Sequence, residues 1–88
     1  MSDVLIMNKA HMDGLQTAFT RNADAVEALI RDLDGVLANT TWDGSRARRF
    51  RDEWSRQFEP GLRRLQQALA ENASFVGKEK ANAMTAMD

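Results

Sequence analysis

Apolar residues recur at three- and four-residue intervals along two stretches of nearly equal length, residues 5–37 and residues 47–76. This spacing is typical of amphipathic helices. The triplet Trp42-Asp43-Gly44 separates the two stretches at the middle of the chain. Glycine allows the backbone conformations that a sharp reversal needs, and the Trp42 ring can pack across the end of a hairpin. The pattern predicts an all-α fold, an antiparallel helix-turn-helix hairpin.

The expected boundaries make residues 1–88 a single helical-hairpin domain. The first helix is predicted at about residues 3–39, the turn at 40–45 and the second helix at about 46–78. Pro60 disrupts helical geometry and predicts a kink in the second helix. The last segment, 79–88, is small and polar with a weak apolar face, so we expect a flexible tail.

The first helix carries more apolar surface than one neighbouring helix can cover. A heptad seam contains Leu5, Met12, Phe19, Val26 and Leu33, with Leu15, Leu29 and Val36 interleaved. Asn8 and Asn22 stand in this seam, where a polar side chain lowers stability but can fix register and partner. Ile30 and Leu37 widen the stripe. A stripe this wide implies that the helix packs against more than one neighbour.

The second helix has an aromatic ridge, because Phe50, Trp54 and Phe58 stand four residues apart. A ridge at helical spacing indicates core residues. We expect that this core is shared between two molecules. The residues expected to be buried in an assembled four-helix bundle are Phe19, Val26, Leu29, Leu33, Trp54, Phe58, Leu65 and Leu69.

Composition argues against an enzyme. The chain has no cysteine, no tyrosine and a single histidine, His11, which we expect at the flank of the seam. Neither a phosphate-binding glycine loop nor a metalloprotease motif occurs. We therefore expect no catalytic residue, no cofactor and no metal ligand.

Charge is unevenly distributed although the formal net charge is only −1. The first half is acidic, and residues 45–76 carry seven arginines against four acids. Helical rotation spreads these arginines around the helix, whereas a nucleic-acid surface concentrates them on one face. No apolar run approaches the roughly 20 residues of a membrane span, and the N-terminus lacks the features of a general secretory signal. An arginine-rich nucleic-acid-binding protein and a membrane-active protein remain alternatives.

The arrangement of Trp42-Asp43-Gly44 between two helices, followed by Phe50 and Trp54, resembles the WXG family of small type VII secretion substrates, the early-secreted-antigen-like proteins. The resemblance covers about residues 5–76. It implies a non-enzymatic hairpin that dimerises into a four-helix bundle, with itself or with a related WXG-type protein. It also implies synthesis in the bacterial cytoplasm and export in the folded state by a membrane complex with an FtsK-like ATPase.

The family's export signal is a tyrosine followed four residues later by an acidic residue. This chain has no tyrosine, although Phe75 and Glu79 match the spacing, as do Met84 and Asp88. We therefore expect a heterodimer whose partner carries the signal, and an FtsK-like ATPase that this chain contacts directly or through the partner. A WXG homodimer is the alternative.

Overall fold

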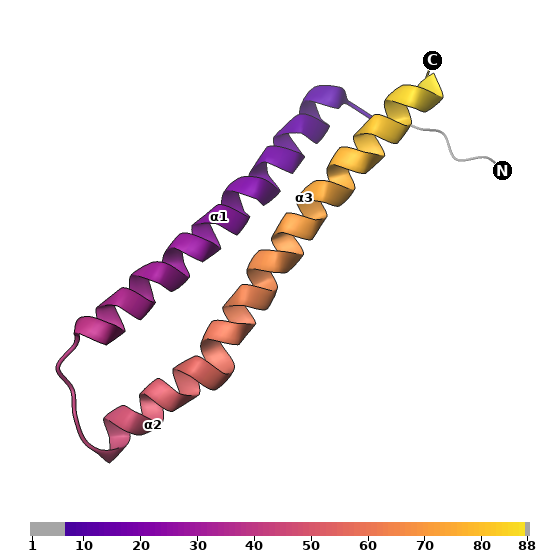
Figure 1. Ribbon diagram of the computed structural model, residues 1–88. Helices are drawn as coiled ribbons and strands as arrows, with labels where there is room; N and C mark the ends of the chain where they lie inside the picture. Colours follow the sequence, from indigo (N-terminus) through magenta and orange to yellow (C-terminus); the bar gives the residue numbers. More distant parts are fainter. Residues whose placement is uncertain (1–6, 88) are drawn as a thin grey trace.

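The chain folds as a hairpin of two antiparallel helical arms (Figure 1). The computed structural model describes residues 7–87, with side chains for residues 7–83. The first arm is α1 (Lys9–Asn39). The second arm contains α2 (Ser45–Glu53), the π-helix η1 (Trp54–Phe58) and α3 (Glu59–Met87). The all-helical hairpin predicted from the sequence is confirmed.

The first helix begins later than predicted, at Lys9 rather than near residue 3. Asn8 is its N-cap: the backbone N–H of His11 donates to the Asn8 side-chain oxygen at 3.0 Å. A side chain that accepts from an unpaired N–H of the first turn stabilises a helix start at that point. Met7 and Asn8 therefore lie outside the helix, and residues 3–6 of the predicted range lie outside the described residues.

The second arm is continuous but changes direction where η1 meets α3 (Figure 1). The N–H of Glu59 donates to the carbonyl of Trp54, five residues earlier, which is a π-helical bond. Pro60 explains the wider turn, because its ring would clash with the carbonyl of Arg56 in a regular α-helix and it has no N–H to donate there. The irregularity expected near Pro60 is thus a π-turn just before the proline.

The π-turn also corrects the register of the arm. Buried and half-buried residues of the second arm recur at 47, 51 and 54, and again at 62, 66, 69, 73, 76, 80 and 83, in steps of four and three. Leu62 follows Trp54 by eight positions, where seven would continue the repeat. A π-turn absorbs one extra residue, so the buried positions keep the same side of the arm before and after it.

The second helix continues past its predicted end near residue 78, because α3 extends to Met87. Flexibility of segment 79–88 stays a prediction. Val76 and Ala83 are buried. The Lys80 ammonium donates to Asp13 Oδ1 at 2.5 Å and to Gln16 Oε1 at 3.1 Å on α1. Contacts with α1 thus stabilise this segment as a helix, although its own apolar face is weak.

Small side chains fill most of the space between the arms. The buried hydrophobic residues are Ala23, Ile30, Ala47, Ala73, Val76 and Ala83. Ile30 alone among the described residues is a large side chain with under 2% exposure. Alanines let two helices approach closely but contribute little apolar area to a core.

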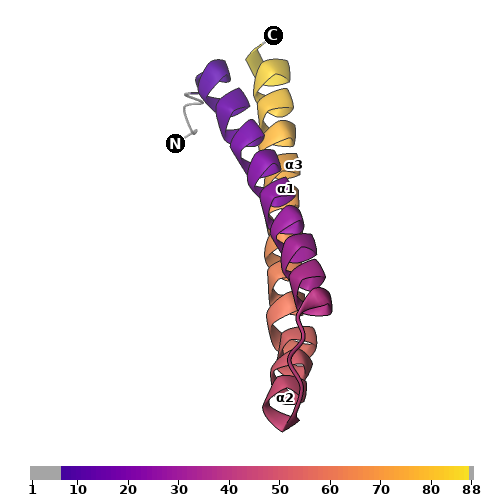
Figure 2. The ribbon, with the colours of Figure 1, turned by 90° about the vertical axis from the view of Figure 1, so that its left-hand side faces the viewer.

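The molecule is a slab one helix thick. Its extents are 64 × 24 × 13 Å, and a single helix with its side chains is about 10–12 Å across. Seen from its edge, the two arms overlap as they cross at a shallow angle (Figure 2). The radius of gyration is 19.6 Å, against about 12 Å for a compact domain of this length. A hairpin of this shape has no closed core.

Acid should weaken the contact that holds the open end of the hairpin. The hydrogen bond from Lys80 lowers the pKa of Asp13 from its ordinary value of 3.8. A lowered folded-state pKa means that the stabilisation is present above the ordinary pKa and is lost as the pH falls through the folded-state pKa. In thermal melts from pH 7 downward, the melting temperature of Asp13→Asn should lie slightly below that of the wild type at pH 7. The difference should shrink below about pH 4. A difference that stays constant with pH would contradict this role for the pair.

Candidate interaction surface

A single arginine organises the turn between the arms. The Arg51 guanidinium on α2 donates to the carbonyls of Trp42 at 2.7 Å, Thr40 at 2.9 Å and Leu37 at 3.4 Å. These carbonyls lie at the end of α1 or just after it, where helical N–H partners become scarce; the Leu37 carbonyl also accepts from the N–H of Thr40 at 3.3 Å. A cation is also favoured there by the helix dipole. Arg51 therefore caps α1 and joins the two arms.

Trp42 packs its ring on Phe50 of α2, with the ring centroids 5.7 Å apart and the planes tilted by 49°. The pair remains accessible: Trp42 is 42% exposed and Phe50 is 39% exposed. Tilted aromatic pairs stabilise by about 0.5–1.5 kcal/mol beyond their buried area. The turn thus presents an ordered aromatic surface at the closed end of the hairpin.

Gly44 has φ 107° and ψ 176°, a backbone conformation that is essentially restricted to glycine. It lies directly before α2, and its carbonyl accepts from the N–H of Arg48 at 3.1 Å. No atom lies within 4 Å of the position that a Cβ would take. The constraint on this residue is therefore conformational rather than steric crowding by neighbours.

A second polar contact joins the arms just inside the turn. The indole N–H of Trp54 donates to Asp34 Oδ1 at 2.7 Å, in a half-buried position. This bond points the indole toward α1, so Trp54 does not stand with Phe58 on the open side. The sequence ridge of Phe50, Trp54 and Phe58 is thereby divided between the seam and the surface.

The residues predicted to form a shared core fall into two groups in the single hairpin. Leu29, Phe58 and Leu65 are exposed by 46%, 49% and 47%. The other five, half-buried at the edge of the seam, are Phe19, Val26, Leu33, Trp54 and Leu69. Ile30, one position further round, is buried in the single hairpin, whereas the described heptad residues beside it are half-buried or exposed. Burial of the eight residues in a bundle stays a prediction.

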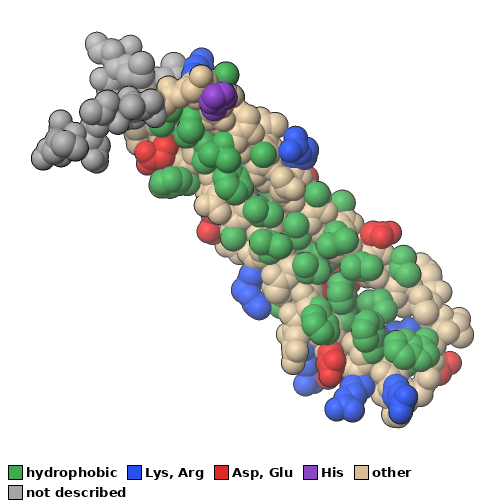
Figure 3. All heavy atoms as spheres, turned by 180° about the vertical axis from the view of Figure 1, so that it is seen from behind, with side chains coloured by type: hydrophobic (Ala, Val, Ile, Leu, Met, Phe, Trp, Pro, Cys, Tyr) green, Lys and Arg blue, Asp and Glu red, His purple; other side chains and the backbone are tan. Residues whose placement is uncertain are grey.

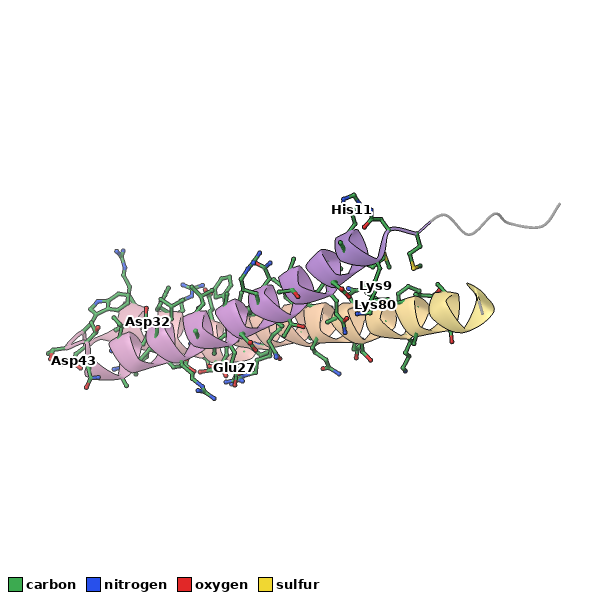
Figure 4. The ribbon with its side chains drawn as sticks, turned by 90° about the horizontal axis from the view of Figure 1, so that it is seen from above. Lys9, His11, Glu27, Asp32, Asp43 and Lys80 are labelled. Carbon is green, nitrogen blue, oxygen red and sulfur yellow. The ribbon has the colours of Figure 1, made fainter. Side chains whose placement is uncertain are left out.

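These side chains belong to one continuous surface, shown in Figure 3, where hydrophobic groups from both arms follow the length of the hairpin. We call it the apolar face. Its exposed members are Leu15, Leu29, Val36, Trp42, Phe50, Phe58, Leu65 and Phe75. Charged groups such as Glu27 point toward the opposite side, while His11 projects on the side of the apolar face near the open end (Figure 4).

The described residues of the proposed export motif, Phe75, Glu79 and Met84, lie in the second half of α3. Phe75 is 60% exposed, and Glu79, also exposed, lies one helical turn further along α3. Met84 lies within α3, without a described side chain, and Asp88 lies outside the described residues. The Phe75–Glu79 spacing is therefore presented on a helix surface, as a docking motif requires.

The described residues offer little for small-molecule chemistry. Two shallow hollows of about 400 and 430 Å³ are lined by residues 16–24 and 31–40, which belong to α1 and the residue after it. A surface formed by one helix cannot enclose a ligand. Within residues 7–87, no three histidine or acidic side chains gather as a metal site would require.

Over the same described part of the chain, no helix has the length and apolarity to cross a membrane.

No protein-family model, curated protein or solved structure matches the chain. Its function is therefore inferred from its own residues and contacts.

Two contacts at the turn lacked a clear sequence signal. The sequence predicts that the arginines of the second arm are solvent-exposed. Arg51 differs from the others only in its spacing: it follows Ala47 by four residues and precedes Trp54 by three. The hydrogen bond between Trp54 and Asp34 could not be predicted from the sequence either, because the two residues are 20 positions apart and meet only once the arms are aligned.

Gly44→Ala should destabilise the hairpin by about 1–3 kcal/mol, because alanine is strained at this φ and ψ. Gly35→Ala is the matched control. It lies within α1 with open space around its Cβ position, so it should stabilise by up to about 1 kcal/mol. Chemical denaturation of both variants measures the two effects. Equal effects of the same sign would contradict the special backbone of Gly44.

Leu33→Ala and Phe58→Ala should each reduce the stability of an assembled bundle by about 2–5 kcal/mol, as truncations in a well-packed core do. Gln67→Ala is a control, since a residue two positions from Leu65 on a helix points away from the apolar face. Concentration-dependent thermal melts measure the effect. Losses below about half a kcal/mol for both face variants would show that the assembly uses another surface.

Proposed function

We propose that this protein is a non-enzymatic WXG-type protein that forms one half of a four-helix bundle and is exported folded by a type VII secretion system. The observation that carries the proposal is the apolar face, which extends along a slab 13 Å thick and exposes leucine and aromatic side chains of both arms. Exposed apolar surfaces of this extent mark sites of protein association.

A second helical hairpin is the partner that fits this surface best. The face is long, nearly flat and built from helical ridges, so another pair of helices can pack on it by placing its ridges in the grooves. Such a partner would complete the core around Leu29, Phe58 and Leu65, which are half-exposed in the single chain. A small ligand would leave most of the face uncovered.

We favour a related WXG-type protein as that partner. The sequence resemblance assigns the export signal to a tyrosine-containing tail, and this chain has no tyrosine. In the heterodimer, the partner would carry the signal to the FtsK-like ATPase. Phe75 and Glu79 would then contribute a weaker second contact from their exposed position on α3.

The turn supports a role in recognition as well as in folding. Arg51 anchors the turn through three backbone carbonyls, so the backbone does not depend on the Trp42 ring. The ring is nevertheless ordered on Phe50 and accessible. Trp42 would therefore present a fixed aromatic edge to the export machinery or to a neighbouring dimer.

Export can be tested in a bacterium that has a type VII secretion system, with a strain lacking its FtsK-like ATPase as the control. The epitope-tagged chain, expressed together with a WXG-type protein that has a tyrosine-containing tail, should reach the culture medium only when the ATPase is present. Trp42→Ala should keep the fold and the dimer yet block export. ATPase-independent release, or retention of the wild-type chain inside the cell, would contradict the proposal. Wild-type stability together with wild-type export of Trp42→Ala would overturn the role of Trp42.

A further inference from the structure

Two asparagines interrupt the apolar face. Asn22 shares the heptad stripe of Leu15, Leu29 and Val36 on α1, and Asn72 follows Leu65 by seven residues on α3. Both asparagines are exposed. They are polar at positions where the rest of each stripe is apolar, so they differ from asparagines scattered over a solvated surface.

The two asparagines lie at the same level of the hairpin. Gln16 on α1 reaches over Gly77 on α3, where its amide nitrogen lies 2.6 Å from the position of a Cβ on that glycine. Asn22 follows Gln16 by six residues, and Asn72 precedes Gly77 by five. Because the arms are antiparallel, the two levels agree to about one residue, or about 1.5 Å along the axis. We call the pair the asparagine belt.

Each amide is only partly used within the hairpin. Asn22 Nδ2 donates to the carbonyl of Ala18 at 2.7 Å, and Asn72 Nδ2 donates to the carbonyl of Ala68 at 2.9 Å. These bonds leave the Oδ1 acceptor and one N–H of each side chain available to another molecule. The belt can therefore form hydrogen bonds with a layer packed on the apolar face.

We propose that a second copy of this chain docks on the apolar face with its asparagine belt against the belt of the first, so that the four amides fix the register of the bundle. This proposal rests on the proposed function, in which the apolar face is the interface of the bundle. It states that, without another partner, a second copy of the chain covers that face. Asn22 lies two residues from the midpoint of α1. Belt-on-belt contact therefore places the middle of α1 in one copy at the level of the middle of α1 in the other.

The available area is sufficient for a stable dimer. The 64 × 24 Å outline of the hairpin corresponds to about 1,500 Å² in projection, and stable interfaces bury about 800 Å² on each partner. Register needs a separate device, because helical ridges repeat every turn and a bundle can slide by one repeat at modest cost. A buried asparagine prevents such slippage, since a slipped amide faces apolar side chains without a partner.

A double-substitution cycle on the full chain tests the belt, with sedimentation equilibrium measuring self-association and circular dichroism checking helicity. Asn22→Leu alone and Asn72→Leu alone should each weaken dimerisation by about tenfold, because each leaves partner amides unpaired in the interface. The double variant should dimerise at least as tightly as the wild type, since both sides of the belt become apolar. Gln67→Leu is the control and should leave dimerisation unchanged.

Additive effects, with each single leucine strengthening the dimer and the double variant strengthening it further, would overturn belt-on-belt contact. A chain that stays monomeric up to about 100 µM, well above the micromolar Kd of a modest interface, would overturn docking of a second copy. These outcomes are separable from failure of the proposed function, because ATPase-dependent export with the partner is measured independently of self-association. If the asparagine variants change dimerisation as predicted but the chain is not exported, only the secretion proposal is refuted.

Discussion

The seam between the two arms is narrow and partly polar, and it buries few of the large apolar side chains of the chain. Alanines make up four of its six buried hydrophobic residues, and charged or amide groups such as Asp13, Gln16 and Lys80 occupy other seam positions. Close approach of the helices therefore leaves Leu29, Leu65 and Phe58 exposed on one side of the hairpin. The apolar face is a direct consequence of this seam.

Polar contacts consequently define the alignment of the arms. Lys80 holds the open end through Asp13 and Gln16, while Trp54 bonds to Asp34 near the turn. Such contacts are directional but contribute modestly to net stability, because water competes for the same groups. Polar groups thus set the alignment of α1 with the second arm. A large apolar core requires a second hairpin packed on the apolar face.

Periodicity alone was sufficient to predict the helical hairpin and the place of its turn, because a 3.6-residue repeat interrupted by Trp42-Asp43-Gly44 has few other solutions. The same periodicity did not show which residues the two arms bury against each other. Ala23 and Ile30 are buried in the hairpin while Phe19 and Leu33 are half-buried, because a hydrophobicity pattern shows how apolar a stripe is but not which neighbour covers it. The end of the second helix was missed because its stability comes from α1 rather than from its own composition.

The central claim is that the apolar face is covered by a second hairpin in solution. Small-angle X-ray scattering at micromolar concentration tests it directly, since the mass and the cross-section of the particle are both measured. The account predicts a mass twice the 9.9 kDa of the chain and a particle about 8–10 Å thicker than the 13 Å slab, the distance between packed helix layers. A 9.9 kDa particle one helix thick that still unfolds cooperatively would contradict it.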